Sequence, residues 1–116
     1  MKILVCGGRD YDDKVAFDRE MDRISMELQR VVCIIHGGAP GADRLADVWA
    51  LERMLPVMRF DAQWQRLGRA AGPIRNGWMI EYGKPDLVVA FPGGRGTADM
   101  VRQATEAAIA VQEIKL

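Results

Sequence analysis

Three glycine-rich turns carry the residues of this chain that are best suited to binding chemistry. The clearest turn, Pro92–Thr97, reads Pro-Gly-Gly-Arg-Gly-Thr and lies between an apolar run and a segment with helical spacing. Similar turns follow Cys6 and His36. Glycine lets the backbone approach a ligand closely, and the free amides of a helix's first turn attract anions such as phosphate. One such turn is as often a plain connection, but three of them favour a shared site for a phosphorylated ligand.

Polar side chains accompany the turns and the helix start at Gly72-Pro73. An arginine can bind a phosphate bidentately, and Asp99, near the start of the last helix, can accept hydrogen bonds from a ribose. A structural role is also open, with His36 as a neutral strand-end side chain and Asp43 as a helix-terminal residue. The residues that we expect to bind the ligand are Gly7, Gly8, Arg9, Asp10, His36, Gly37, Gly38, Gly41, Asp43, Arg75, Asn76, Pro92, Gly93, Gly94, Arg95, Gly96 and Thr97.

The composition predicts a single globular domain spanning residues 1–116. Apolar residues make up 49% of the chain and charged residues 28%, which is ordinary for a globular protein. Sixteen basic residues balance 16 acidic ones, so no overall charge favours a nucleic-acid or membrane partner. We see no apolar run of transmembrane length and no leader pattern, and we expect a cytoplasmic protein in which Cys6 and Cys33 are buried thiols. One histidine and two cysteines lack the spacing of a metal site.

Several well-known nucleotide-binding and catalytic motifs are missing from the sequence. The second turn reads Gly37-Gly38-x-x-Gly41 and is therefore not a G-x-G-x-x-G loop. A P-loop lysine motif and a G-x-S-x-G nucleophile elbow are also absent. The sequence thus gives no support to P-loop triphosphate hydrolysis or to serine-hydrolase chemistry.

Apolar runs alternate with helical spacings along the chain. The predicted strands are Lys2–Cys6, Val31–Ile35, Pro56–Phe60, Asp86–Phe91 and Ala110–Ile114. The predicted helices are one capped by Asp12 or Asp13 that runs to about Arg30, then Ala42–Met54, then one from Gly72-Pro73 to about Tyr82, and finally Thr97–Ala108. We expect the segment Asp61–Ala71 to be irregular.

This alternation predicts an α/β fold, because strands that are apolar on both faces belong to a parallel sheet covered by helices. We expect a three-layer, Rossmann-like, doubly wound parallel sheet of five strands. Right-handed crossovers then favour the strand order 3-2-1-4-5. In this order the first and fourth strands are neighbours, so the turns at Gly7 and Pro92 flank one crevice at the carboxyl edge of the sheet. The turn at Gly37 lies next to them.

The motifs, taken in order, resemble the SLOG superfamily and most of all its small YspA-like, cpYpsA-related branch. The stretches that carry the resemblance are Gly7–Tyr11, His36–Asp43, Ala71–Asn76 followed by Met79, and Pro92–Thr97. The resemblance implies a Rossmann-like domain that binds nucleotides or nucleotide-derived molecules, including NAD or ADP-ribose derivatives. It also implies a bacterial or phage setting.

More distant relatives in that superfamily, the phosphoribohydrolases once called lysine decarboxylases, cut the N-glycosidic bond of nucleoside monophosphates. Their signature, Pro-Gly-Gly-x-Gly-Thr-x-x-Glu with an upstream arginine, is similar to the last turn here. By this resemblance Arg75 would hold the phosphate. The glutamate position is Met100, and Asp99 stands one residue earlier. Arg75 and Asp99 are therefore the candidate catalytic residues, and Asp99 depends on a shifted helix start.

Three functions follow as hypotheses. The leading one is binding of a nucleotide derivative, by a sensor or a weak enzyme, and the second is N-glycosidic cleavage of nucleoside monophosphates. The third is single-stranded DNA binding through a local patch of Arg9, Arg69, Arg75 and Arg95, against which the zero net charge argues.

Trp64 and Trp78 can stack on a base, although core or subunit contacts are commoner for tryptophan. Their place in the least regular segment leads us to expect a homodimer.

Overall fold

A single parallel sheet forms the centre of the computed structural model, which describes residues 1–28 and 30–115. Within these residues the strands are β1 (Lys2–Cys6), β2 (Cys33–His36), β3 (Val57–Arg59), β4 (Leu87–Ala90) and β5 (Ala110–Glu113). Their order is β3-β2-β1-β4-β5, and each neighbouring pair is parallel. The predicted α/β class and strand order are confirmed.

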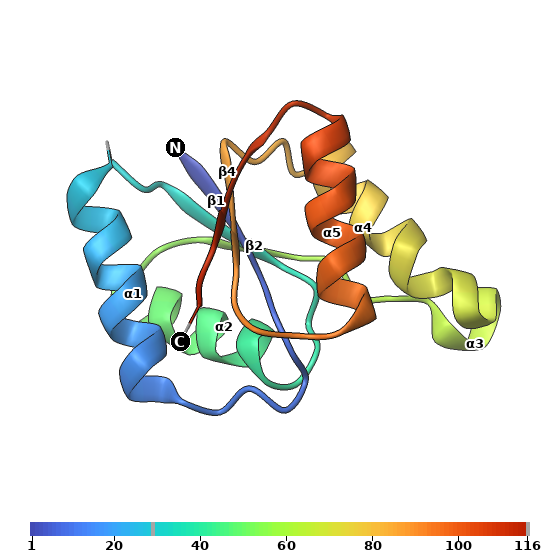
Figure 1. Ribbon diagram of the computed structural model, residues 1–116, viewed down its shortest axis with the longest axis horizontal. Helices are drawn as coiled ribbons and strands as arrows, with labels where there is room; N and C mark the ends of the chain where they lie inside the picture. Colours follow the sequence, from blue (N-terminus) through green and yellow to red (C-terminus); the bar gives the residue numbers. More distant parts are fainter. Residues whose placement is uncertain (29, 116) are drawn as a thin grey trace.

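Helices cover both faces of this sheet, as Figure 1 shows. One face carries α1 (Lys14–Glu27) and α2 (Ala42–Glu52), and the other carries α4 (Ala71–Glu81) and α5 (Arg95–Glu106). A short helix, α3 (Trp64–Leu67), and a 3₁₀ turn, η1 (Gly68–Ala70), extend the α4 side outward (Figure 1). The layers are those of a Rossmann-like fold.

The two cores follow from the alternation of side chains along the central strands. On β1, Ile3 and Val5 face α1 and α2, whereas Leu4 and Cys6 face α4 and α5. Successive strand residues point to opposite faces, so a run that is apolar throughout fills both layers. This burial on both faces explains why the apolar runs of the sequence identified the central strands so directly.

Several element boundaries differ from the predicted ones. The first helix was predicted to reach about Arg30 but ends at Glu27, and position 29 of that prediction lies outside the described residues. The segment Asp61–Ala71, predicted to be irregular, contains α3 and η1. The last helix begins at Arg95, two residues earlier than predicted, with Gly94 as its N-cap. The earlier start of α5 places its first residues within the third glycine turn.

The pairing of β1 with β4 places their carboxyl ends side by side, with Cys6 opposite Ala90 in register. The turns that follow these two strands therefore meet at one edge of the sheet, as the predicted strand order requires. In the described part of the chain, no helix has the length and apolar character needed to span a membrane.

Candidate functional site

The three glycine turns are bonded to one another through Gly8. Its amide donates to the Pro92 carbonyl at 2.8 Å, and its carbonyl accepts from the Ala42 amide at 3.2 Å. Gly41 lies at φ +80°, and a Cβ there would overlap the Gly8 carbonyl oxygen. Only glycine combines that backbone angle with such close contact. Segments far apart in the sequence are thereby fixed around one crevice.

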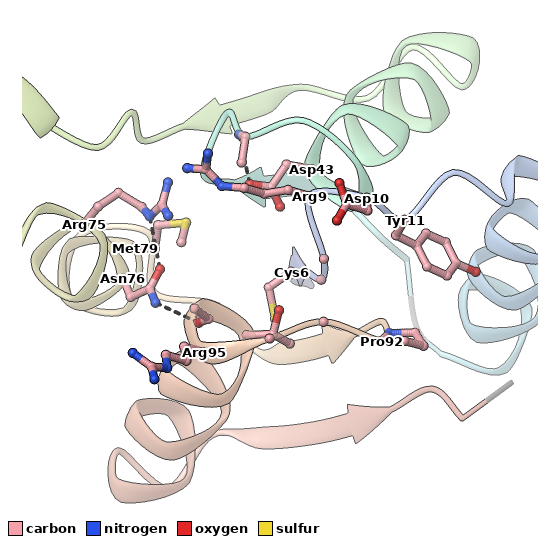
Figure 2. Close-up of a pocket in the computed structure, with 17 residues that line it drawn as sticks. Cys6, Arg9, Asp10, Tyr11, Asp43, Arg75, Asn76, Met79, Pro92 and Arg95 are labelled. Carbon is pink, nitrogen blue, oxygen red and sulfur yellow. Dashed lines mark hydrogen bonds between the residues drawn. The ribbon is translucent and has the colours of Figure 1, made fainter. Parts of the chain in front are cut away.

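This crevice is a cavity of about 590 Å³, drawn in Figure 2, which we call the crevice cavity. Most of the predicted binding residues line it: Gly7, Gly8, Arg9, Asp10, Asp43, Arg75, Asn76, Pro92, Gly93, Gly94, Arg95, Gly96 and Thr97. Its lining also includes residues that were not among the predicted binding residues: Cys6, Tyr11, Ala39 and Met79. Each of these lies next to a predicted residue or, for Met79, one helical turn after Arg75, and that adjacency was the available signal.

The second turn uses its amides internally, and several of its predicted residues lie away from the crevice cavity. The Asp43 Oδ2 accepts from the amides of Gly37 at 3.2 Å and Ala39 at 3.1 Å. His36 is buried; its Nδ1 accepts from the Gly38 amide at 3.0 Å, so its Nε2–H donates to Asp47 at 2.8 Å. This bonding describes a neutral imidazole in a structural position. The residues outside the lining are His36, Gly37, Gly38 and Gly41.

The third turn leaves a helix end open to the crevice cavity. The N-cap of α5 is Gly94, which has no side chain to accept from the helix amides. Helix geometry gives the amides of Arg95, Gly96 and Thr97 no intrahelical acceptor, and all three residues line the cavity. Thr97, predicted as the first residue of this helix, lies within its first turn, and its hydroxyl lies against Gly93. The positive end of α5 therefore borders the crevice cavity.

Two comparisons with known proteins agree with this geometry. The pattern of the YspA, cpYpsA-related SLOG family matches residues 1–67. The chain is also similar to the Gene 61 protein of Mycobacterium phage D29, with 35% identity over 121 residues that span 95% of this chain and 93% of the phage protein. The chain belongs to the YspA, cpYpsA-related SLOG family. The predicted family is thus confirmed, and one relative is a phage protein.

In this SLOG protein, Arg75 joins helix α4 to the second turn. Its Nη1 donates to the Gly37 carbonyl at 2.6 Å, and its Nε donates to the Asn76 Oδ1 at 3.0 Å. Burial lowers the pKa of the Arg75 guanidinium, and the nearby Asp43 carboxylate opposes that shift. Arginine remains charged at neutral pH, so Arg75 brings a positive charge to the crevice cavity while two of its nitrogens are already bonded.

Asn76 extends this network from α4 to α5. Its side chain is buried, and its Nδ2 donates to the Gly96 carbonyl at 3.2 Å and to Asp99 Oδ2 at 2.9 Å. Figure 2 shows Arg75 and Asn76 together on α4, with Asn76 directed at the start of α5. The amide side chain therefore fixes the open helix end relative to the arginine.

Asp99 is held by donors from α4 and α5. Besides Asn76, the Gln103 Nε2 donates to it at 2.8 Å and an Arg102 nitrogen donates at 2.6 Å. Burial alone would raise the pKa of Asp99, but these hydrogen bonds outweigh burial and lower that pKa below its ordinary value. Asp99 lines a neighbouring cavity and not the crevice cavity. Its carboxylate is thus ionised at neutral pH and already accepts three side-chain hydrogen bonds.

The cysteine that lines the crevice cavity is not a reactive nucleophile. Burial raises the pKa of the Cys6 thiol to about 12, with a further contribution from Asp43, so the thiolate is not formed at neutral pH. Burial also raises the pKa of Asp43, although the amides of Ala39 and Gly37 act in the opposite direction. The groups of this site that can contact a ligand are therefore its amides and arginines, which are suited to binding an anion.

Proposed function

We propose that this protein binds a nucleotide or a nucleotide-derived ligand, with a phosphate held at the N-terminus of α5. The observation that carries the proposal is the first turn of α5, where Arg95, Gly96 and Thr97 line a cavity of about 590 Å³ and their amides have no acceptor within the helix. Backbone amides at a helix start bind phosphate without a dedicated side chain. Membership of the SLOG family supports the nucleotide part of the proposal.

Arginines give the crevice cavity the charge that such a ligand needs. Arg9, Arg75 and Arg95 line it, and within the described residues none of them pairs with a carboxylate within 4.0 Å. The second turn is a poorer phosphate site, because the Asp43 carboxylate already accepts from its amides. An anion that entered the cavity would therefore be drawn to α5 rather than to α2.

Binding, as by a sensor or a weak enzyme, is the activity that these contacts favour. N-glycosidic cleavage assigns Asp99 the task of stabilising a sugar cation. That carboxylate accepts from Asn76, Gln103 and Arg102 and faces the neighbouring cavity. A carboxylate with its oxygens so occupied is poorly placed for that task, and we do not propose cleavage as the function.

Thermal unfolding in the presence of AMP, ADP-ribose and NAD tests the proposal, with adenosine as the control that lacks a phosphate. A ligand at 100 times its dissociation constant stabilises the folded state by about 2.7 kcal/mol, which raises the Tm of a domain of this size by several degrees. We expect such a shift with at least one phosphorylated compound and none with adenosine. No shift with any of the phosphorylated compounds would overturn the proposal.

A further inference from the structure

A second cavity adjoins the crevice cavity on the side of α3 and α4. It also measures about 590 Å³, and it shares Arg9, Arg75, Arg95 and Gly96 with the crevice cavity. Its remaining lining, which distinguishes it, consists of Trp64, Arg69, Gly72, Pro73 and Asp99. We call this second space the tryptophan annex. Because the two cavities have these lining residues in common, one extended ligand can occupy both.

Trp64 gives the annex an aromatic surface. It begins α3, and 48% of its surface is exposed, which is unusual for a residue that normally packs into a core. The Arg9 guanidinium lies 5.5 Å from the centroid of its ring. The ring also lies against Gly72, where an added Cβ would come within 3.4 Å of it. Nucleic-acid bases of any type stack on aromatic side chains exposed in this way.

The annex is strongly positive although the chain as a whole has zero net charge. Four arginines line it, namely Arg9, Arg69, Arg75 and Arg95. Its one lining carboxylate, Asp99, is paired with Arg102 at 2.6 Å. Arg69, like Arg9 and Arg95, has no carboxylate within 4.0 Å among the described residues. This excess of positive charge in the annex is larger than a single phosphate at α5 requires.

We propose that the tryptophan annex receives the base of the ligand against Trp64, while the arginines between the annex and α5 bind a second phosphate. This inference rests on the function proposed above and narrows it to a ligand class. The protein then prefers a nucleoside diphosphate, or a nucleotide whose phosphates form a pyrophosphate link, over a nucleoside monophosphate. Stacking does not distinguish one base from another, so the annex selects the number of phosphates more strongly than the identity of the base.

Isothermal titration of the full chain with AMP, ADP and inorganic pyrophosphate tests this proposal. We expect ADP to bind more tightly than either AMP or pyrophosphate. Trp64→Ala should weaken ADP binding by at least about fivefold, and Trp64→Phe should retain most of the affinity because a ring remains. Arg69→Gln should reduce the advantage of ADP over AMP. Arg66→Gln, on the same short helix but outside both cavities, should leave all affinities unchanged.

The outcomes separate this proposal from the one on which it rests. Equal affinities for AMP and ADP, with no effect of Trp64→Ala, would overturn the role of the annex and leave nucleotide binding intact. Pyrophosphate that binds as tightly as ADP would exclude base stacking on Trp64. Failure of AMP and ADP to bind the unsubstituted protein would overturn the annex, and failure of ADP-ribose and NAD as well would overturn the proposed function. Thermal unfolding of each variant checks that the exposed positions can be changed without loss of the fold.

Discussion

Gly41 holds the first and second glycine turns together at a point where no side chain has room. It lies at φ +80°, and a Cβ there would overlap backbone atoms of Gly8 and Arg9. Gly68 also has a positive φ, +58°, but nothing lies within 4 Å of the position that its Cβ would occupy. The two glycines thus separate the cost of the backbone angle from the cost of crowding.

We predict that Gly41→Ala destabilises the protein much more than Gly68→Ala does. Gly68→Ala should lower the free energy of unfolding by about 1–3 kcal/mol, because φ +58° combined with ψ −134° is a backbone region that essentially only glycine occupies. Gly41→Ala has a similar angular cost and adds the overlap with Gly8, so it should cost at least about 2 kcal/mol more than Gly68→Ala. Urea denaturation of both variants measures the difference, and equal losses would contradict the close packing of the turns.

Asp43 and Asp99 should affect stability in opposite directions as the pH changes around 3.8, the ordinary pKa of an aspartate. The pKa of Asp99 is lowered in the folded state, so its stabilising contribution is present above 3.8 and is lost as the pH falls through the folded value. The pKa of Asp43 is raised, so the folded state loses stability as the pH rises from 3.8 through that higher value.

The corresponding asparagine variants test these signs. Asp99→Asn should flatten the loss of unfolding free energy at acid pH, because the group that is protonated there has been removed. Asp43→Asn should remove a contribution to the free energy of unfolding that decreases as the pH rises. The free energy of unfolding should therefore increase more steeply above pH 3.8 than in the unsubstituted protein. Urea denaturation across the acid range reads out both slopes. A change of the same sign in both variants would contradict the burial and bonding described for these side chains.

The partners of single side chains were the least predictable feature of the site. The sequence places Asn76 beside Arg75, but it does not reveal that the Asn76 amide bonds Gly96 and Asp99, which are 20 and 23 positions away. Such contacts depend on how α4 and α5 pack, and no local pattern encodes that packing. The glycines that follow His36 suggested that its ring contacts a ligand. In the structure the amide of Gly38, one of those glycines, donates a hydrogen bond to that ring.

At the scale of the element, α5 concentrates the proposed chemistry at its first turn. Its N-cap, Gly94, has nothing within 4 Å of the position of a Cβ, so a side chain can be added there without crowding. An aspartate at an N-cap accepts from the first-turn amides and also favours the helix dipole. The same carboxylate would stand where we place the phosphate of the ligand.

We therefore predict that Gly94→Asp stabilises the protein and weakens its binding. The free energy of unfolding should rise by roughly 0.3–1 kcal/mol, while the affinity for ADP should fall at least about tenfold through repulsion between like charges. Gly94→Asn is the matched control, because it keeps a capping oxygen without the charge and should retain more of the affinity. Unaltered ADP binding by Gly94→Asp would contradict a phosphate at this helix end.

The elements themselves were predictable where their apolar spacing was regular. β1, β4 and the body of each long helix lie where the pattern placed them. The start of α5 was predicted too late because Thr97 is a strong N-cap type, and its hydroxyl instead lies against Gly93. The short helix α3 was missed because four residues followed by Gly68 are too few to show a period.

At the scale of the whole molecule, the strand order followed from general rules of chain topology. Parallel strands joined by right-handed crossovers, with apolar residues on both faces, leave few arrangements for a chain of this length. The order fixed which turns meet, and hence the crevice. It did not predict the tryptophan annex, because that space depends on where α3 and η1 carry Trp64 and Arg69 beyond the sheet.

Self-association stays a prediction at this scale. Among the exposed apolar side chains of the described residues, Leu51 is 73% exposed and Met54 is 91% exposed at the end of α2. A second copy of the chain is one way to cover such side chains. Light scattering of the purified protein should give twice the chain mass of 12.9 kDa, and a monomer at high protein concentration would contradict the expected homodimer.

A phosphate at the N-terminus of α5 is tested best by a two-dimensional NMR titration that follows individual backbone amides. We predict that ADP shifts the amide resonances of Arg95, Gly96 and Thr97 in a saturable manner, and that adenosine leaves them in place because it lacks a phosphate. Resonances at these three amides that stay unchanged at saturating ADP, or that move equally with adenosine, would contradict a phosphate bound at the N-terminus of α5.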